Sequence, residues 1–174
     1  MYIIGTDKLC VSFGEKVVLS DVTFSINQGD KLAIVGVNGA GKSTLLRTLT
    51  GEQKALEGAL TLHGKALNDY SRGERARQIA VVLTQRVEAS QMLAEEVVAL
   101  GRLPYTNLMG SLKSADLEVV NHAIRVTGIT HLRQRRIGSL SDGERQRVML
   151  AKALAQETPF ILMDEPTAFL DYPS

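Results

Sequence analysis

Apolar residues in this chain follow two patterns, one of alternating runs and one of continuous runs. The alternating kind comes first, in KLCVSF (8–13), VVLSDVTFSI (17–26) and ALTLHG (59–64), where β-branched and aromatic residues stand between turn residues. Runs of this kind are typical of antiparallel strands with one exposed face. We therefore expect an antiparallel sheet in the N-terminal part of the chain.

Three further apolar runs are continuous: LAIV (32–35), IAVVL (79–83) and FILM (160–163). Continuous runs are typical of parallel strands that are buried on both faces. Each is followed at once by glycine or polar residues. Because ligands of parallel α/β sheets bind beyond the carboxyl ends of the strands, we expect the functional site at these three ends.

Helical spacing of apolar residues occupies much of the remaining sequence. We predict helices over 42–50, 92–101, 114–127 and 142–157. The second and third are expected to end at Gly101 and Gly128, and Ser114 is the expected N-cap of the third. One face of the fourth helix should carry Val148, Ala151, Leu154 and Ala155.

Together these patterns predict an α/β fold with a mostly parallel buried sheet, an N-terminal antiparallel β subdomain and an inserted helical subdomain. A length of 174 residues suits one domain with a proper core. We divide it into a core at 1–85, a helical subdomain at 86–140 and a final segment at 141–174.

Composition and charge exclude several classes of protein. The 20 Lys and Arg residues against 19 Asp and Glu leave a net charge of +1, so no basic excess points to nucleic acid. A single cysteine, Cys10, excludes an intrachain disulfide framework and fits a reducing compartment. No apolar run approaches the roughly 18 residues of a membrane helix, and we expect a soluble protein, which can still dock on a membrane protein.

The segment GVNGAGKST (36–44) matches the motif G-x-x-x-x-G-K-[ST] between a predicted strand and a predicted helix. Its glycines let backbone N–H groups surround phosphate oxygens, and the helix N-terminus adds partial positive charge. The alternative is a glycine-rich turn without a ligand. As a nucleotide-binding loop it would use Asn38, Gly39, Ala40, Gly41, Lys42, Ser43 and Thr44.

Polar residues at the strand ends supply the expected chemistry for ATP and Mg²⁺. Lys42 should reach the β- and γ-phosphates, and Ser43 should ligate Mg²⁺. Asp164 is expected to hold Mg²⁺ through water, while Glu165 acts as general base on the attacking water. Gln85 is predicted to sense the γ-phosphate and its water and to contribute to the metal site. The predicted catalytic residues are thus Glu165, Gln85 and Lys42.

The segment LSDGERQRVMLAKALAQ (140–156) begins with Ser141-x-x-Glu144, a capping box that opens a helix. A cap alone does not explain its place 23 residues before Asp164 (164 − 141). Together GVNGAGKST, Gln85, LSDGERQR, ILMDEP and TAFLD resemble the ATP-binding subunits of ABC transporters, in order and over nearly the whole chain.

The resemblance implies a head-to-tail homodimer that holds two ATP molecules between its subunits. Each ATP would meet the phosphate loop of one subunit and, from the other, Ser141 and the backbone of Gly143. The aromatic residue that stacks on adenine in this family corresponds to Phe13, for which the alternative is a core position in the N-terminal sheet. Asp171, in TAFLD, matches the loop that crosses between subunits.

The chain departs from the usual family signature LSGGQ at two positions. Asp142 replaces the first glycine and Glu144 replaces the glutamine. A carboxylate near a γ-phosphate is repulsive unless it points away or pairs with Arg145 or Arg147. We expect Asp142 to point toward solvent or the permease-facing surface.

The stretch VVALGRLPYTN (97–107) and the segment EPTAFLD resemble the branch of the family that drives uptake of iron–siderophore chelates, haem or cobalamin. There this stretch receives a helix of the membrane permease, with Leu103, Pro104 and Tyr105 as the exposed contacts here. The alternative is a helix end at Gly101 followed by a proline turn. The implied protein lies on the cytoplasmic face of the inner membrane, bound to permease subunits and indirectly to a periplasmic or lipoprotein chelate-binding protein, without nucleic acid.

Other classes of ATPase contain the same motifs. DNA-repair and chromosome-structure ATPases usually place a long coiled coil between them, but Lys42 and Ser141 are 99 residues apart (141 − 42) without sustained heptads. Ribosome-associated ABC proteins normally carry two such domains. The family also has a γ-phosphate histidine after the crossing loop, and this chain has no histidine after Asp164. We therefore expect a C-terminally truncated chain, with a nucleotide-binding fragment of little turnover as a further alternative.

Overall fold

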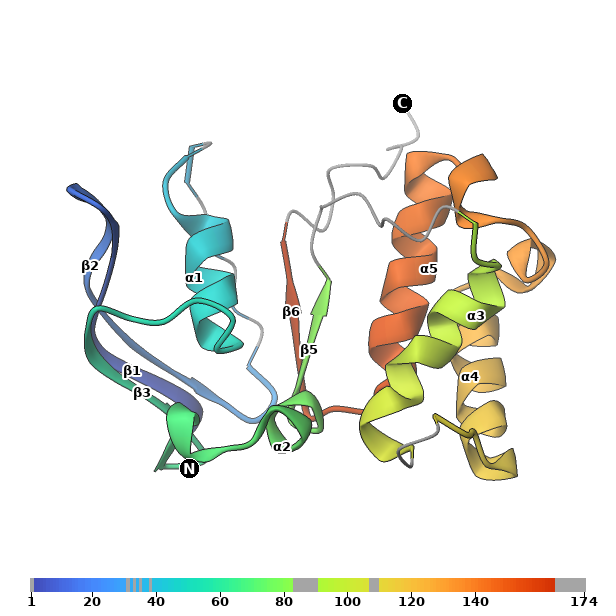
Figure 1. Ribbon diagram of the computed structural model, residues 1–174, viewed down its shortest axis with the longest axis horizontal. Helices are drawn as coiled ribbons and strands as arrows, with labels where there is room; N and C mark the ends of the chain where they lie inside the picture. Colours follow the sequence, from blue (N-terminus) through green and yellow to red (C-terminus); the bar gives the residue numbers. More distant parts are fainter. Residues whose placement is uncertain are drawn as a thin grey trace. The chain divides into compact units, whose positions relative to one another are not determined.

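The computed structural model forms two compact units, Met1–Arg75 and Ala76–Ser174, and each is described by itself (Figure 1). The residues that the structure describes are 2–30, 32, 34, 36–37, 39–82, 91–106 and 110–164.

The first unit is built on a four-stranded antiparallel sheet with the strand order β2-β1-β3-β4. The long strands β1 (Tyr2–Phe13) and β2 (Lys16–Asn27) form a hairpin, and β3 (Glu57–Leu62) pairs with the other edge of β1. The short strand β4 (Lys65–Ala66) completes the sheet. The predicted N-terminal antiparallel sheet is confirmed.

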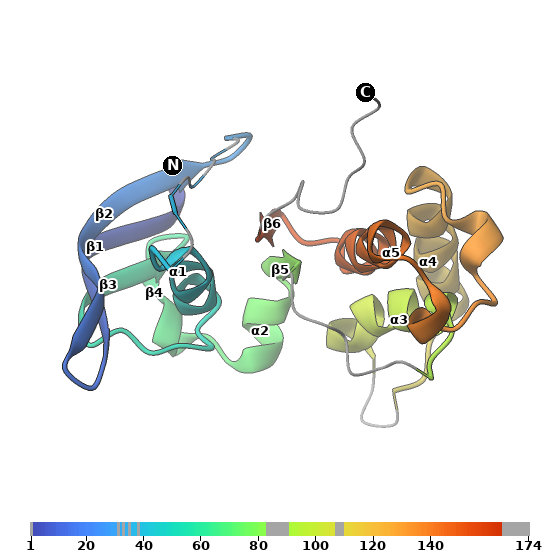
Figure 2. The same ribbon diagram turned by 90° about the horizontal axis from the view of Figure 1, so that it is seen from above.

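One helix, α1 (Lys42–Leu49), lies over this sheet (Figure 2). It matches the predicted helix over 42–50. A 3₁₀-helix (Leu67–Asp69) and the short helix α2 (Arg72–Ala76) follow the sheet in the chain. The apolar side of α1 is in the core through Leu45, Leu46 and Leu49.

A predicted buried strand over 32–35 is not observed at the described positions. Leu32 and Ile34 lie outside any strand and are 57% and 38% exposed. A strand needs a neighbour to pair its backbone N–H and C=O groups. No described strand of this unit pairs with the run, so the prediction is wrong for these two residues.

The second unit contains a parallel pair of strands, β5 (Ile79–Val82) and β6 (Phe160–Met163). Residues 79 to 82 stand in register opposite residues 160 to 163. Two of the three continuous apolar runs therefore form the parallel pairing that their pattern predicts.

The described residues of the second unit also form three α-helices: α3 (Ala94–Ala99), α4 (Ser114–Val126) and α5 (Asp142–Ala155). Figures 1 and 2 show α5 between the β5–β6 pair and the helices α3 and α4. Two further 3₁₀-helices, Thr130–Leu132 and Ile137–Ser139, lie between α4 and α5.

The helix α5 joins two apolar cores because it has two buried sides. Its Ala153 packs with Ala80 and Val82 of β5. On the other side, α5 contributes to a core with α3 and α4 through Val148, Ala151 and Ala155. Leu154 was expected on this face but is 36% exposed, because it lies about 120° around the helix from Val148.

Two predicted helix ends also differ from the structure. The second predicted helix does not end at Gly101; α3 continues into a 3₁₀-helix, Leu100–Tyr105, which we call the 100–105 segment. Ser114 is the first residue of α4, and the N-cap is Lys113, whose backbone N–H donates to the Asp116 carboxylate at 3.0 Å. The acidic residue at the third position of the helix thus accepts from the N–H of the N-cap residue, as in the second half of a capping box.

Within the described residues, no helix has the length and apolar character that crossing a lipid bilayer requires.

Candidate functional site

The predicted site residues are divided between the two units, and several lie outside the described part of the chain. The residues outside the described part are Asn38, Gln85, Glu165 and Asp171, and their roles remain predictions. The described residues form a phosphate loop in the first unit and the signature helix and the end of β6 in the second.

The phosphate loop has the backbone that its glycines make possible. Gly39 and Gly41 have φ values of +85° and +90°, which side chains with a Cβ rarely adopt. A Cβ on Gly41 would also lie 3.0 Å from both Cγ1 and the carbonyl oxygen of Val18. The loop therefore packs too closely on β2 for any larger residue at position 41.

The loop leads directly into the N-terminus of α1. Gly41 is the N-cap and makes no side-chain cap hydrogen bond, and the first turn of the helix contains no acidic residue. The first N–H groups of a helix have no intrahelical acceptor, and the helix dipole gives this end partial positive charge. This end of α1 is therefore suited to an anionic group such as a phosphate.

Lys42 places its ammonium group inside the loop. Its Nζ donates to the carbonyl oxygens of Gly36 at 2.7 Å and of Val37 at 3.2 Å. An ammonium has three donors, and these two bonds use two of them. The positive charge thus lies in the curve of the loop, and the donor set and the glycine backbone fit a polyphosphate.

Two of the predicted metal ligands, Ser43 and Asp164, are described by the structure, and each is considered within its own unit. Ser43 is in the first turn of α1, and Asp164 is buried at the end of β6, where its N–H donates to Val82 O at 2.9 Å. Mg²⁺ prefers such ligands and completes its shell with water and substrate phosphates. Across the described ranges, no three His, Cys, Asp or Glu side chains form a metal cage. The hydroxyl of Ser43 and the carboxylate of Asp164 are each of the oxygen type that Mg²⁺ prefers.

The signature helix α5 begins with the predicted capping box. The N–H of Glu144 donates to Ser141 Oγ at 3.3 Å, and the N–H of Ser141 donates to the Glu144 carboxylate at 2.8 Å. The second of these bonds is the largest cause that lowers the pKa of Glu144, with smaller contributions from Arg135 and Arg147. Glu144 is therefore held as an anion within the cap.

The unusual Asp142 side chain lies mostly in solvent and is paired. It is 64% exposed and accepts a hydrogen bond from Arg145 Nη1 at 2.9 Å. The expectation that it points to solvent agrees with this geometry. Its orientation relative to a permease stays a prediction.

Phe13 ends β1 and is 53% exposed, so the alternative of a core position is wrong for this residue. An exposed aromatic ring is available for stacking, and its contact with adenine remains a prediction.

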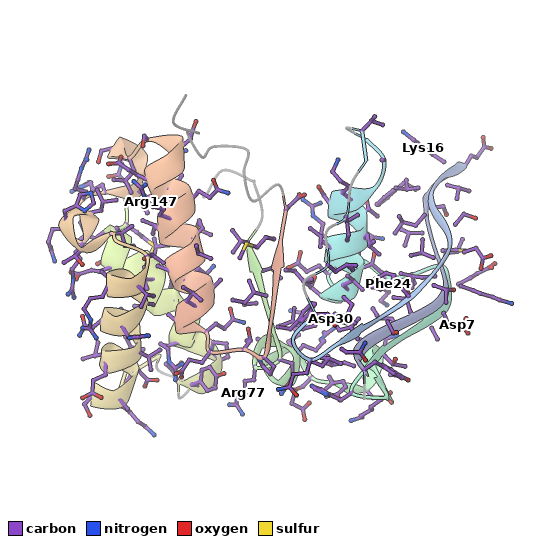
Figure 3. The ribbon with its side chains drawn as sticks, turned by 180° about the vertical axis from the view of Figure 1, so that it is seen from behind. Asp7, Lys16, Phe24, Asp30, Arg77 and Arg147 are labelled. Carbon is purple, nitrogen blue, oxygen red and sulfur yellow. The ribbon has the colours of Figure 1, made fainter. Side chains whose placement is uncertain are left out.

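The 100–105 segment presents less apolar surface than the sequence predicts. Leu103 is exposed, whereas Pro104 and Tyr105 are half-buried. Both residues make hydrogen bonds within the Ala76–Ser174 unit. Tyr105 Oη donates to Gln156 O at 2.9 Å, and Pro104 O accepts a hydrogen bond at 2.9 Å from Nε of Arg77, which is labelled in Figure 3.

Sequence reasoning missed Arg102, which is only 7% exposed. Its Nε donates to Asp116 at 2.9 Å, and its Nη1 donates to Ala155 O at 2.9 Å and to Glu157 at 2.8 Å. Its guanidinium also lies 4.2 Å from the centre of the Tyr105 ring. The signal in the sequence is one arginine within the otherwise apolar stretch ALGRLPY.

Comparisons with known proteins agree with these local geometries. The family profile described as ABC transporter matches residues 19–168. An uncharacterised ABC transporter ATP-binding protein of Methanocaldococcus jannaschii is 43% identical over 166 residues, which cover 95% of this chain and 57% of that protein.

Two relatives carry a stated role. An iron(3+)-hydroxamate import ATP-binding protein of Bacillus subtilis is 38% identical, with 97% of this chain and 62% of that protein covered. A hemin import ATP-binding protein of Pseudomonas fluorescens is 44% identical, with coverages of 91% and 62%. The chain thus spans about 60% of the length of these relatives.

A solved structure gives the same result for the fold. A nucleotide-free ATP-binding cassette from an ABC transporter superposes with a TM-score of 0.84 at 28% identity, over 98% of this chain and 71% of the other. The phosphate loop, the capped signature helix and these matches lead to one conclusion: the chain belongs to the family of ABC transporter ATP-binding proteins.

Proposed function

We propose that this chain binds ATP at the phosphate loop and is the ATP-hydrolysing part of an ABC importer for a metal chelate. One observation carries the nucleotide part: Gly39 and Gly41 have positive φ, and the Lys42 ammonium lies in the loop at an uncapped helix N-terminus. These features together suit a polyphosphate.

The proposed division of labour follows the predicted roles. Lys42 neutralises charge on the β- and γ-phosphates, and Ser43 and Asp164 hold Mg²⁺, which supplies further charge neutralisation when bound. Glu165 takes the proton of the attacking water, and Gln85 orients that water.

A head-to-tail homodimer would complete the site. The backbone of Gly143 and the hydroxyl of Ser141 come from the other subunit, at the N-terminus of α5, and Phe13 stacks on the adenine. The proposed organisation of the chain keeps a core at 1–85, a helical subdomain at 86–140 and a final segment at 141–174.

The import role is supported by the two relatives that import iron hydroxamate and hemin, both of which are metal chelates. We place the protein at the cytoplasmic face of the membrane, where Leu103 of the 100–105 segment is the exposed apolar contact for a permease. A chelate-binding protein is an indirect partner, and nucleic acid is not a partner.

A second candidate function is nucleotide binding without turnover. It is favoured by the coverage of the relatives, because the chain spans only 57% to 62% of their length. ATP binding without phosphate release by this chain would support it, and Lys42-dependent release would contradict it.

Replacing Lys42 by alanine is expected to weaken ATP binding about 10- to 100-fold, because a charge-assisted contact to phosphate is lost. The measurement is titration with a fluorescent ATP analogue in the presence of Mg²⁺. Lys54→Ala removes an equal charge at an exposed position outside the loop and should leave the affinity unchanged. Equal affinities for Lys42→Ala and the unmodified chain would contradict nucleotide binding at this loop.

The import role is tested in cells of the source organism that lack the gene. We expect uptake of at least one labelled chelate, from haem, a ferric hydroxamate and cobalamin, to fall to background and to return with the intact gene but not with Lys42→Ala. Unchanged uptake of all three chelates would contradict the proposed substrate class.

A further inference from the structure

The first turn of α5 carries two carboxylates where the proposed function needs an anion to bind. Asp142 and Glu144 are the acidic residues of this turn. Acidic side chains stabilise a helix N-terminus, but their charge opposes a γ-phosphate placed at the same end. Positive charge must therefore offset the two carboxylates of this turn if it is to contact the γ-phosphate of ATP.

Each carboxylate of this turn is paired with an arginine. Asp142 accepts a hydrogen bond from Arg145 Nη1 at 2.9 Å. The same guanidinium donates through Nη2 to the carbonyl oxygen of Leu140 at 3.0 Å. Arg145 therefore contacts the residues on both sides of Ser141, and its hydrogen bond to Leu140 O orients the guanidinium group.

The second arginine comes from the loop before the helix. Arg135 Nη1 lies 3.6 Å from Glu144 Oε1, and its Nη2 donates to Ser139 O at 3.0 Å. Its own carbonyl oxygen accepts from the N–H of Ala94, at the start of α3, at 2.9 Å. Arg135 is thus anchored by its backbone and its side chain beside the signature helix.

Folding stability does not account for these two pairs. The Arg135 and Asp142 side chains are 48% and 64% exposed, and ion pairs at such positions add little to stability. Glu144 is already satisfied as an anion by the N–H of Ser141. The clear effect of the arginines is on charge: the guanidinium groups of Arg135 and Arg145 offset the two carboxylates, and Arg147 adds a further positive charge that acts on Glu144.

We propose that Arg135 and Arg145 are positioning residues that neutralise Asp142 and Glu144, so that an acidic signature segment can accept the γ-phosphate of ATP held by the other subunit. This inference rests on the proposed function. It adds to the reaction one residue, Arg135, that lies outside the signature itself.

The test is ATP-dependent dimerisation of the intact protein with Mg²⁺, followed by light scattering in a Glu165→Gln background that prevents turnover. We expect Arg135→Gln and Arg145→Gln each to raise the ATP concentration for half-maximal dimerisation about five- to tenfold, since each removes one positive charge that offsets a carboxylate near the phosphate. Binding of a fluorescent ATP analogue to the monomer should stay unchanged, because it reports on the phosphate loop alone.

A compensating variant and a matched control separate this role from a structural one. Adding Glu144→Gln to Arg135→Gln should restore dimerisation to within about twofold, because glutamine keeps the capping box without the charge. Arg133→Gln removes an equal charge from a pair with Glu95, 3.0 Å away, and should have no effect. Equal losses for Arg133→Gln and Arg135→Gln would overturn the inference.

The variant Ser141→Ala distinguishes failure of the inference from failure of the proposed function. If Ser141→Ala weakens dimerisation while both arginine variants behave as the unmodified protein, the inference is overturned and the proposed function stands. If Ser141→Ala retains helix content and dimerises normally, the role of the signature fails, and the inference fails with it.

Discussion

Replacing Arg102 by methionine is expected to destabilise the Ala76–Ser174 unit by about 3–5 kcal/mol, because it leaves the buried Asp116 carboxylate without its charge partner. Arg102 is held at 2.9 Å from Asp116 and also donates to the end of α5. For a chain of this size the loss corresponds to a fall in Tm of about 6 °C or more. Thermal unfolding followed by circular dichroism measures it.

The pair with Asp116 can be isolated by a second substitution. Arg102→Met combined with Asp116→Asn should recover much of the lost stability, since no buried charge is then left unpaired and the amide oxygen can still accept from the N–H of Lys113. Arg133→Met, which breaks the half-buried and partly solvated pair with Glu95, should cost less than about 1 kcal/mol. Equal losses of unfolding free energy for Arg102→Met and Arg133→Met would contradict the burial of the Arg102–Asp116 pair in solution.

The same pair has a defined pH dependence. The backbone N–H of Lys113 and the Arg102 guanidinium hold the pKa of Asp116 below its usual value of 3.8. A lowered pKa in the folded state means that the stabilisation is complete above pH 3.8 and is lost as the pH falls through the lowered pKa. The difference between the unmodified chain and Arg102→Met should therefore narrow in acid.

Replacing Gly101 by alanine is expected to cost about 1–3 kcal/mol or more, because the added methyl group has no space. A Cβ at this position would lie 2.3 Å from the carbonyl oxygen of Lys152 and 3.2 Å from the Cβ of Ala155. Both contacts are on α5, so the 100–105 segment would have to move away from the helix. Urea unfolding of the purified variant measures the loss.

The control for this substitution is Gly73→Ala in α2. A Cβ there meets no atom within 4 Å, and alanine is the better helix former by up to about 1 kcal/mol. Gly73→Ala should therefore be neutral or stabilising. Equal stability of the two variants would show that the contact between the 100–105 segment and α5 is looser than the distances indicate.

The phosphate loop and the signature cap could be predicted because each is local. The glycines of GVNGAGKST and the Ser141-x-x-Glu144 box act on neighbours within a few residues, and the structure shows the backbone and the hydrogen bonds that these patterns require. The Asp142–Arg145 pair could be predicted for the same reason, because side chains three positions apart on a helix are neighbours.

Contacts between distant segments could not be read in this way. Leu154 has the apolar character of its neighbours, yet it is 36% exposed because it lies about 120° around α5 from the buried Val148. The run 32–35 carries the pattern of a buried strand, but its described residues are exposed. An apolar run becomes a strand only where another strand provides hydrogen bonds.

The sequence by itself determined three strands of the N-terminal sheet, the phosphate loop, the opening of the signature helix and the family to which the chain belongs. The tertiary structure alone decided that Arg102 is buried against Asp116 and α5, and that Arg135 reaches Glu144. The physical reason is distance along the chain. Local patterns fix backbone conformation and caps, whereas the pairing of a charge depends on which remote segment folding places beside it.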